Sequence, residues 1–240
     1  MSGGRPYPTG GTMPDDWYYH TLRFLHPLGA FTAFVAATVA LLSVKGGRRH
    51  IVAGRWFVGG MTLGATAGIL MSLRHSPPSW GLLFLGLVTL SFIATGYLAP
   101  AVGRGSRRDY RRDRAATVLG VLASVALIWN GLLDFTPRAL IEDGVIYGGI
   151  GLAVSAAHAR WRGPADPSRW RVEHLTSMLA GYTVVWSFIF ELYIRVVLPR
   201  AAQVLIPSIV GSAGILWARR RFGAPGAARG AGARVTAGAA

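Results

Sequence analysis

The sequence predicts an all-α integral membrane protein, a bundle of seven transmembrane helices with the N-terminus outside and the C-terminus in the cytoplasm. Two observations carry this prediction. The 240-residue chain is 52% hydrophobic and 15% charged, with a mean hydropathy of +0.39, which is too apolar for an ordinary soluble domain. Its basic residues also gather on alternate connections between apolar segments, as the positive-inside rule requires.

Residues 45–75 contain the clearest single span. From Trp56 to Leu73 the chain has no formal charge. At about 1.5 Å per residue this run is about 27 Å long, close to the roughly 30 Å hydrocarbon core of a bilayer. Four basic residues precede the run and Arg74 alone follows it, so we expect the Lys45 end inside and the His75 end outside.

The remaining elements follow from the same alternation of apolar runs and polar connections. Residues 1–20 are rich in glycine and proline and lack the basic and apolar regions of a signal peptide, so we expect a retained disordered tail. Residues 222–240 form a second disordered tail, rich in Ala, Gly and Arg. Between them we expect one domain, residues 21–221, with spans at about 22–44, 51–73, 80–102, 115–134, 140–159, 173–197 and 201–218.

The charges of the connections set the orientation. Residues 103–114, GRGSRRDYRRDR, hold six arginines and are the strongest cytoplasmic marker, whereas residues 134–144 carry three acids and one arginine. With seven spans, nineteen of the 25 basic residues fall inside, and deleting a span would place a basic connection outside. The net charge of +15 therefore reflects topology in a cytoplasmic (inner) membrane and not a nucleic-acid partner.

Small residues at helical spacing predict close helix packing. Gly60, Gly64 and Gly68 recur every four residues in the second span, and Gly144 and Gly148 do so in the fifth. Such faces let two backbones approach closely, so these spans are expected in the interior or against other membrane subunits.

Several classes of site are excluded or weakened by composition. The chain has no cysteine, which excludes disulfides, iron–sulfur clusters and thiol nucleophiles. Its single lysine, Lys45, lies in a predicted cytoplasmic connection, so a retinal Schiff base in the last span is excluded. A zinc hydrolase stays open through His50, His158, Glu173 and His174 at the inner ends of three spans, although no HxxxH motif is present.

Histidines at matched depths are the strongest hint of chemistry. His26 and His75 lie at the outer ends of the first two spans, while His50, His158 and His174 lie at the inner ends of the second, fifth and sixth. A haem b held by two histidines needs imidazoles that face each other at one level, and either group could supply them. An interfacial or capping role for each histidine is the alternative.

Polar residues near the outer ends of the spans form a second candidate. Glu191 lies in the outer half of the sixth span with Arg195 four residues on, a spacing that allows an ion pair. Asn130 and Asp134 are one turn apart at the end of the fourth span. With His26 and His75 these residues predict an outward-facing polar cluster that could carry protons or substrate.

Two segments resemble a family of bacterial polytopic membrane proteins known as a domain of unknown function. The first, HPLGAFTAFVAATVALLSVKGGRRHIVAGRWFVGGMTLGATAGIL, carries His26, Gly29, His50, Gly54 and Arg55. The second, EHLTSMLAGYTVVWSFIFELYIRVVLPRAAQVLIPSIVGSAGILWARRRF, carries His174, Met178, Tyr182, Pro207 and Gly211. The chain departs from the family pattern in RRDYRRDR, where relatives carry a histidine. The resemblance implies a helical bundle of the inner membrane and brings no activity with it.

Three functions are therefore expected in order of preference. The first is a haem-associated or other membrane redox protein that uses the paired histidines. The second is a small proton-coupled transporter that uses Glu191 and Asp134. The third is a non-catalytic accessory subunit that packs against a larger membrane complex through the Gly60, Gly64 and Gly68 face.

Overall fold

The computed structural model describes residues 17–74, 78–133, 139–193 and 200–222. Within these ranges the side chains of 139–143, 191–193, 200, 201, 204 and 218 are not described. The described residues are almost wholly helical. The all-α prediction is confirmed. In chain order the elements are α1 (Trp17–Leu42), α2 (Arg48–Arg74), α3 (Trp80–Gly103), α4 (Arg107–Leu133), the π-helix η1 (Ala139–Gly148), α5 (Gly149–Ala159), the short 3₁₀ turns η2 (Gly163–Ala165) and η3 (Pro167–Arg169), α6 (Trp170–Tyr193) and α7 (Arg200–Phe222).

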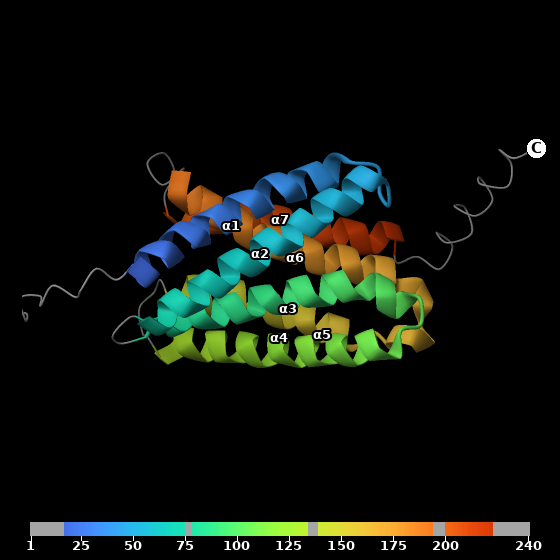
Figure 1. Ribbon diagram of the computed structural model, residues 1–240. Helices are drawn as coiled ribbons and strands as arrows, with labels where there is room; N and C mark the ends of the chain where they lie inside the picture. The colour runs from blue at the N-terminus through green and yellow to red at the C-terminus, as the bar shows by residue number, and fades with distance from the viewer. Residues whose placement is uncertain (1–16, 75–77, 134–138, 194–199, 223–240) are drawn as a thin grey trace, which may run out of the picture.

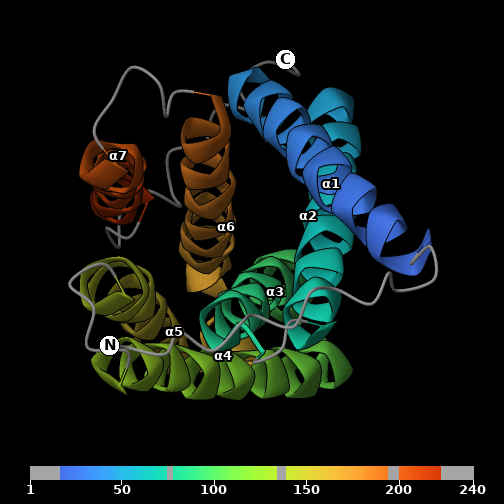
Figure 2. The same ribbon diagram turned by 90° about the vertical axis from the view of Figure 1, so that its left-hand side faces the viewer.

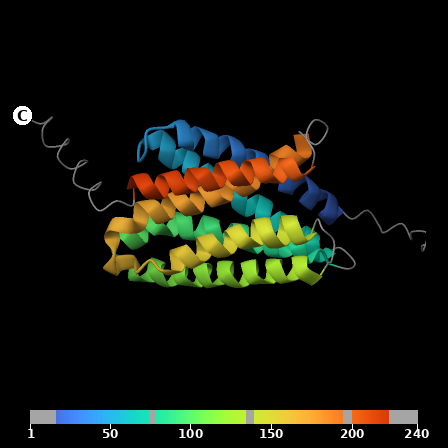
Figure 3. The same cartoon turned by 180° about the vertical axis from the view of Figure 1, so that it is seen from behind.

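The helices run along a common direction and pair with their chain neighbours (Figure 1). α1 packs against α2, α3 against α4, and α6 against α7, while α6 also contacts α3 and α1. From behind, α5 and α7 lie nearest the viewer (Figure 3), and α6 lies between α7 and the pair of α1 and α2 (Figure 2). α3 contacts α2, α4 and α6 and includes Ala99 and Val102, which have no exposed surface. α3 is therefore the central helix.

Four helices, α1 to α4, are long and apolar enough to cross a membrane, and Gly144–Ala159 is a shorter apolar helix. Their outward faces are apolar as well: Phe31, Leu122 and Trp129 are exposed by 54%, 63% and 62%. A soluble protein does not leave such faces to water, whereas lipid covers them without cost. The chain is thus a helical membrane protein.

α1 and α2 approach closely because glycine lies where they meet. A Cβ on Gly60 would lie 2.8 Å from both Ala33 N and Gly29 O, and one on Gly29 would lie 2.5 Å from Gly64 N. Gly60 and Gly64 therefore face α1 within this chain. Gly144 and Gly148 of η1 are buried too.

α4 begins at Arg107, eight residues before the expected span, so most of the arginine-rich connection is helical. The reason is a cap that the sequence carries as S-R-R-D. The Asp109 backbone N–H donates to Ser106 Oγ at 3.3 Å, and that hydroxyl donates to Asp109 Oδ2 at 2.6 Å. The turn before it needs Gly105, whose φ of +94° is unfavourable for other residues.

α1 likewise begins at Trp17, inside the segment expected to be disordered, with Trp17 and Tyr18 exposed. At its other end Lys45 Nζ donates to the carbonyls of Leu41 at 2.6 Å and Ala40 at 3.1 Å. The ammonium closes the C-terminus of α1, where a positive charge is favoured. Partial burial lowers the pKa of Lys45 below its ordinary value.

Candidate functional site

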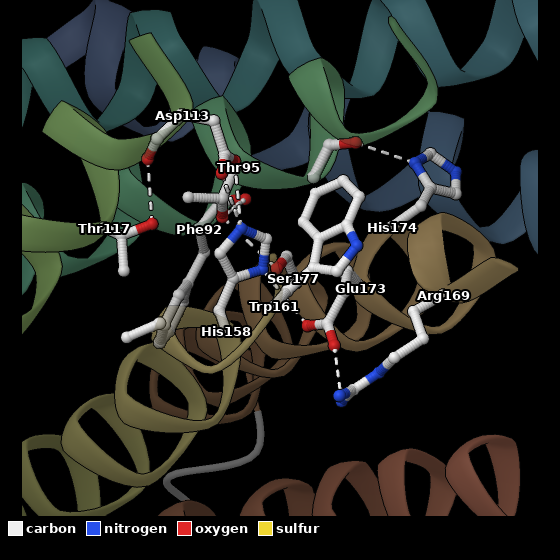
Figure 4. A network of polar contacts seen from close by, with 12 residues as sticks. Phe92, Thr95, Asp113, Thr117, His158, Trp161, Arg169, Glu173, His174 and Ser177 are labelled. Carbon is white, nitrogen blue, oxygen red and sulfur yellow. Dashed lines mark hydrogen bonds and ion pairs between the residues drawn. The ribbon is translucent and has the colours of Figure 1, made fainter. Parts of the chain in front are cut away.

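A buried charged network joins α4, α5 and α6 at the end of the bundle where the arginines gather (Figure 4). Asp113 and Glu173 have no exposed surface and His158 is 2% exposed. His158 Nε2 lies 2.9 Å from Asp113 Oδ1, and Nδ1 lies 3.2 Å from Glu173 Oε2. Arg169 donates to the other oxygen, Glu173 Oε1, at 3.1 Å. Both ring nitrogens of one imidazole therefore face carboxylates.

The two contacts of His158 differ in kind. The Asp113 contact is a hydrogen bond to both carboxylate oxygens, at 2.9 and 3.1 Å. His158 Nδ1 and Glu173 Oε2 make no hydrogen bond with any described residue, so their 3.2 Å approach is an electrostatic contact of poor alignment. With His158 protonated, its charge and that of Arg169 balance the two carboxylates, which is the condition under which charges are tolerated in an interior.

Trp161 closes the network from the connection after α5. Its ring lies edge-on to His158, with ring centres 5.5 Å apart, and it has no exposed surface. The indole Nε1–H donates to Asp166 O at 2.9 Å. The indole thus keeps water from the ion pairs and is itself held by the following turn.

This network does not form a metal centre. His158 has no ring nitrogen left for a metal because both face carboxylates. Among the described residues no group of three or more His, Asp or Glu side chains is placed to hold a metal ion. The described residues therefore supply no set of zinc ligands for the zinc-hydrolase alternative.

His50 and His174 come together from α2 and α6, with ring centres 6.4 Å apart and planes inclined by 71°. His50 Nδ1 lies 3.0 Å from Ala40 O of α1, and His174 Nδ1 lies 2.7 Å from Gly96 O of α3. A carbonyl oxygen only accepts, so Nδ1 is the protonated nitrogen in each ring. In the neutral form of each ring, Nε2 then carries the lone pair through which a histidine binds a metal.

Glu173 and His174 are consecutive on α6, so their side chains leave the helix about 100° apart. Figure 4 shows Glu173 on the side of His158 and His174 turned toward the α3 carbonyl. The charged network and the histidine pair therefore share one turn of α6. The network fixes the rotation of this turn and with it the direction of His174.

At the other end of the bundle His26 and Asn130, two members of the expected outer cluster, line one cavity. His26 Nδ1 donates to Gly64 O of α2 at 2.8 Å, and Phe188 lies edge-on to its ring with centres 5.1 Å apart. His75, Asp134 and Arg195 lie outside the described residues, as does the side chain of Glu191. The expected pairing of His26 with His75 and of Glu191 with Arg195 therefore stays a prediction.

Sequence reasoning named His158 and Glu173 but missed Asp113, Arg169 and Trp161. Asp113 lies in a run of arginines that was interpreted as a solvated connection. The signal that could have found it is its helical spacing to the small residues of the buried face of α4, namely Thr117, Gly120 and Ser124.

Comparisons of the chain with protein-family models, with curated proteins and with solved structures found no match.

Proposed function

We propose that the chain is a membrane redox protein that holds a haem b between His50 and His174. The observation that carries this proposal is the spacing of the two imidazoles, whose ring centres are 6.4 Å apart. A metal–nitrogen bond of about 2 Å on each side, with about 1 Å from each nitrogen to its ring centre, sets two axial imidazoles about 6 Å apart. The pair thus has the separation that one iron between them requires.

The anchoring of both rings supports the same function. Each Nδ1–H is donated to a backbone carbonyl of a neighbouring helix, which fixes the ring and leaves Nε2 as the ligand atom. A histidine that only caps a helix needs the hydrogen bond to the carbonyl, but it does not need a second imidazole beside it. Two rings anchored in the same way on different helices, and next to each other, favour a shared ligand.

The surroundings of the pair also suit a haem. Gly54, one turn beyond His50 on α2, has no atom within 4 Å of the place of a Cβ. Arg48, Arg49 and Arg55 are exposed on the same helix and could pair with the two propionates. With histidine on both sides the iron would have no open position, so it would transfer single electrons and leave oxygen unbound.

The proposed protein crosses the cytoplasmic membrane seven times, with the N-terminus outside and the histidine pair near the cytoplasmic face. The support is the distribution of arginines, which favours the α3–α4 connection, the α5–α6 connection and the end of α7 on one side. The histidine pair lies at the end of α2 that begins with Arg48 and Arg49, which is the same side.

Optical spectra of the full chain, purified from cells supplied with a haem precursor, test this proposal. We expect a Soret band and a sharp α band on reduction in the wild-type protein. Both bands should be lost in His50→Leu and in His174→Leu, since bis-histidine ligation needs each ring, and retained in His20→Leu, which changes an exposed histidine of α1. A wild-type protein without a Soret band, or two variants that keep the wild-type spectrum, would contradict the proposal.

A further inference from the structure

A cavity of about 670 Å³ lies at the opposite end of the bundle from the histidine pair, and α1, α2, α3, α4, η1 and α6 all contribute to its wall. Figure 2 views the molecule from this end, with α1, α2, α3 and α6 around the middle. The volume is that of a site for a small organic molecule. Because α1 to α4 have the length and hydropathy of membrane spans, such a molecule would reach the cavity from the lipid.

The wall of the cavity is largely apolar. Met61, Leu82 and Phe188 supply apolar surface, and Gly60, Gly64 and Gly86 of α2 and α3 also line the cavity. A flat, apolar ring could lie against such a wall. A strongly charged ligand would lose its hydration there without compensation.

Polar side chains interrupt the apolar wall, among them His26 and Asn130. His26 donates Nδ1–H to Gly64 O, so in the neutral ring Nε2 is the acceptor. Asn130 also lines the cavity. The amide can donate to a carbonyl, while the imidazole accepts from a hydroxyl.

We propose that this cavity binds the head group of a lipid-soluble quinone or quinol. A quinol is a flat apolar ring with a hydroxyl at each end. It therefore matches the apolar wall, the acceptor of His26 and the amide of Asn130 together, and its isoprenoid tail can remain in the lipid. The preference for a quinone over other amphipathic rings rests on the redox function proposed above. The inference that the cavity binds an amphipathic ring does not depend on that function.

Equilibrium binding of decylubiquinol, the reduced form of the short-chain quinone decylubiquinone, to the full chain in nanodiscs under anaerobic conditions tests this inference, because the quinol carries the hydroxyl that His26 would accept from. We expect saturable binding of one molecule per chain. His26→Leu and Asn130→Leu should each weaken it about tenfold, because each removes one hydrogen bond from an apolar site. Ala65→Phe, which fills the cavity without removing a polar group, should abolish it. Val125→Phe on the exposed face of α4 should bind as the wild type does.

Each contrary result is distinct. Absence of saturable binding, or equal binding by Ala65→Phe and the wild type, would overturn the inference even if the Soret band is present. Equal binding of decylbenzene, which has the ring and tail but no oxygen, would show that the cavity takes a lipid chain and would also overturn it. A protein that binds the quinol with the expected variant pattern but has no Soret band would contradict the haem proposal alone, because the binding measurement does not use the haem.

Discussion

Asp113 and His158 form an ion pair in which both side chains are buried, with 2.9 Å between Oδ1 and Nε2, and it joins α4 to α5. Removing the Asp113 charge leaves a protonated His158 and Arg169 facing one carboxylate, Glu173, so one buried positive charge loses its compensation. We therefore expect Asp113→Asn to lower the free energy of unfolding by about 3 kcal/mol. Reversible unfolding in mixed detergent micelles, followed by tryptophan fluorescence, measures this change.

Asp109→Asn is the matched control, because it makes the same substitution one turn earlier on α4. Asp109 is partly exposed, and its ion pair with Arg112 is longer, at 3.5 Å between Oδ1 and the guanidinium nitrogen. An asparagine oxygen at this position can still accept from the Ser106 hydroxyl, so the substitution keeps the cap of α4. An exposed pair of this kind contributes about 1 kcal/mol or less. Equal losses in the two variants would show that burial of the Asp113 pair has no special energetic role.

A second prediction concerns the contact between α1 and α2. A Cβ at Gly60 would lie 2.8 Å from backbone atoms of Ala33 and Gly29, which cannot move away without separating the two helices. Overpacking of this kind costs about 2 kcal/mol, so Gly60→Ala should lower the free energy of unfolding by about that amount. The same unfolding measurement applies.

Gly59→Ala is the control on the same helix, since no atom lies within 4 Å of the place of its Cβ. Alanine is a better helix former than glycine, so this variant should gain up to about 1 kcal/mol. The opposite signs at adjacent positions are the test. A loss at Gly59 as large as that at Gly60 would mean that the α1–α2 contact does not explain the cost at Gly60, because helix propensity favours alanine at both positions.

The sequence predicted the helices well because one physical signal dominates, the run of apolar residues between charges. The expected span 80–102 agrees with α3 at Trp80–Gly103, and 51–73 agrees with α2 at Arg48–Arg74. The signal reports where a helix is apolar and not where it ends. α4 therefore extends eight residues into the arginines, where a cap and not hydropathy sets its start.

The candidate site could be predicted only in part. Histidines at equal depth can be counted from the sequence, which is why His50 and His174 are among the predicted ligands. Packing between helices decides which of their faces meet. The sequence of one helix does not contain the information about its partner. Asp113 shows the difference: its neighbours in sequence are arginines, whereas its neighbours in space are His158 and the buried face of α4.

The third prediction tests the proposed topology. The chain has no cysteine, so a single introduced thiol reports on one position without background. In intact cells a membrane-impermeant maleimide should label Ser79→Cys, which lies before α3, and should leave Arg108→Cys unlabelled until the membrane is opened. The physical reason is the excess of arginines around residue 108, which favours the cytoplasmic side. Labelling of both positions in intact cells, or of residue 108 alone, would refute the arrangement.

The last prediction concerns the space beside His50. Gly54 follows His50 by one turn and so lies on the same face of α2, whereas Gly59, nine residues after His50, lies on the opposite face. Neither glycine has an atom of another secondary-structure element within 4 Å of the place of its Cβ, so a side chain can begin at both positions without a clash. If a haem occupies the space between His50 and His174, Gly54→Phe should lower the haem content per chain at least fivefold, and Gly59→Phe should leave it unchanged. The pyridine haemochrome assay measures the haem content, and the unfolding measurement shows that both variants are folded. Equal haem content in two folded variants would place the haem elsewhere, because a ring the size of phenylalanine beside an axial ligand leaves no room for the edge of a porphyrin.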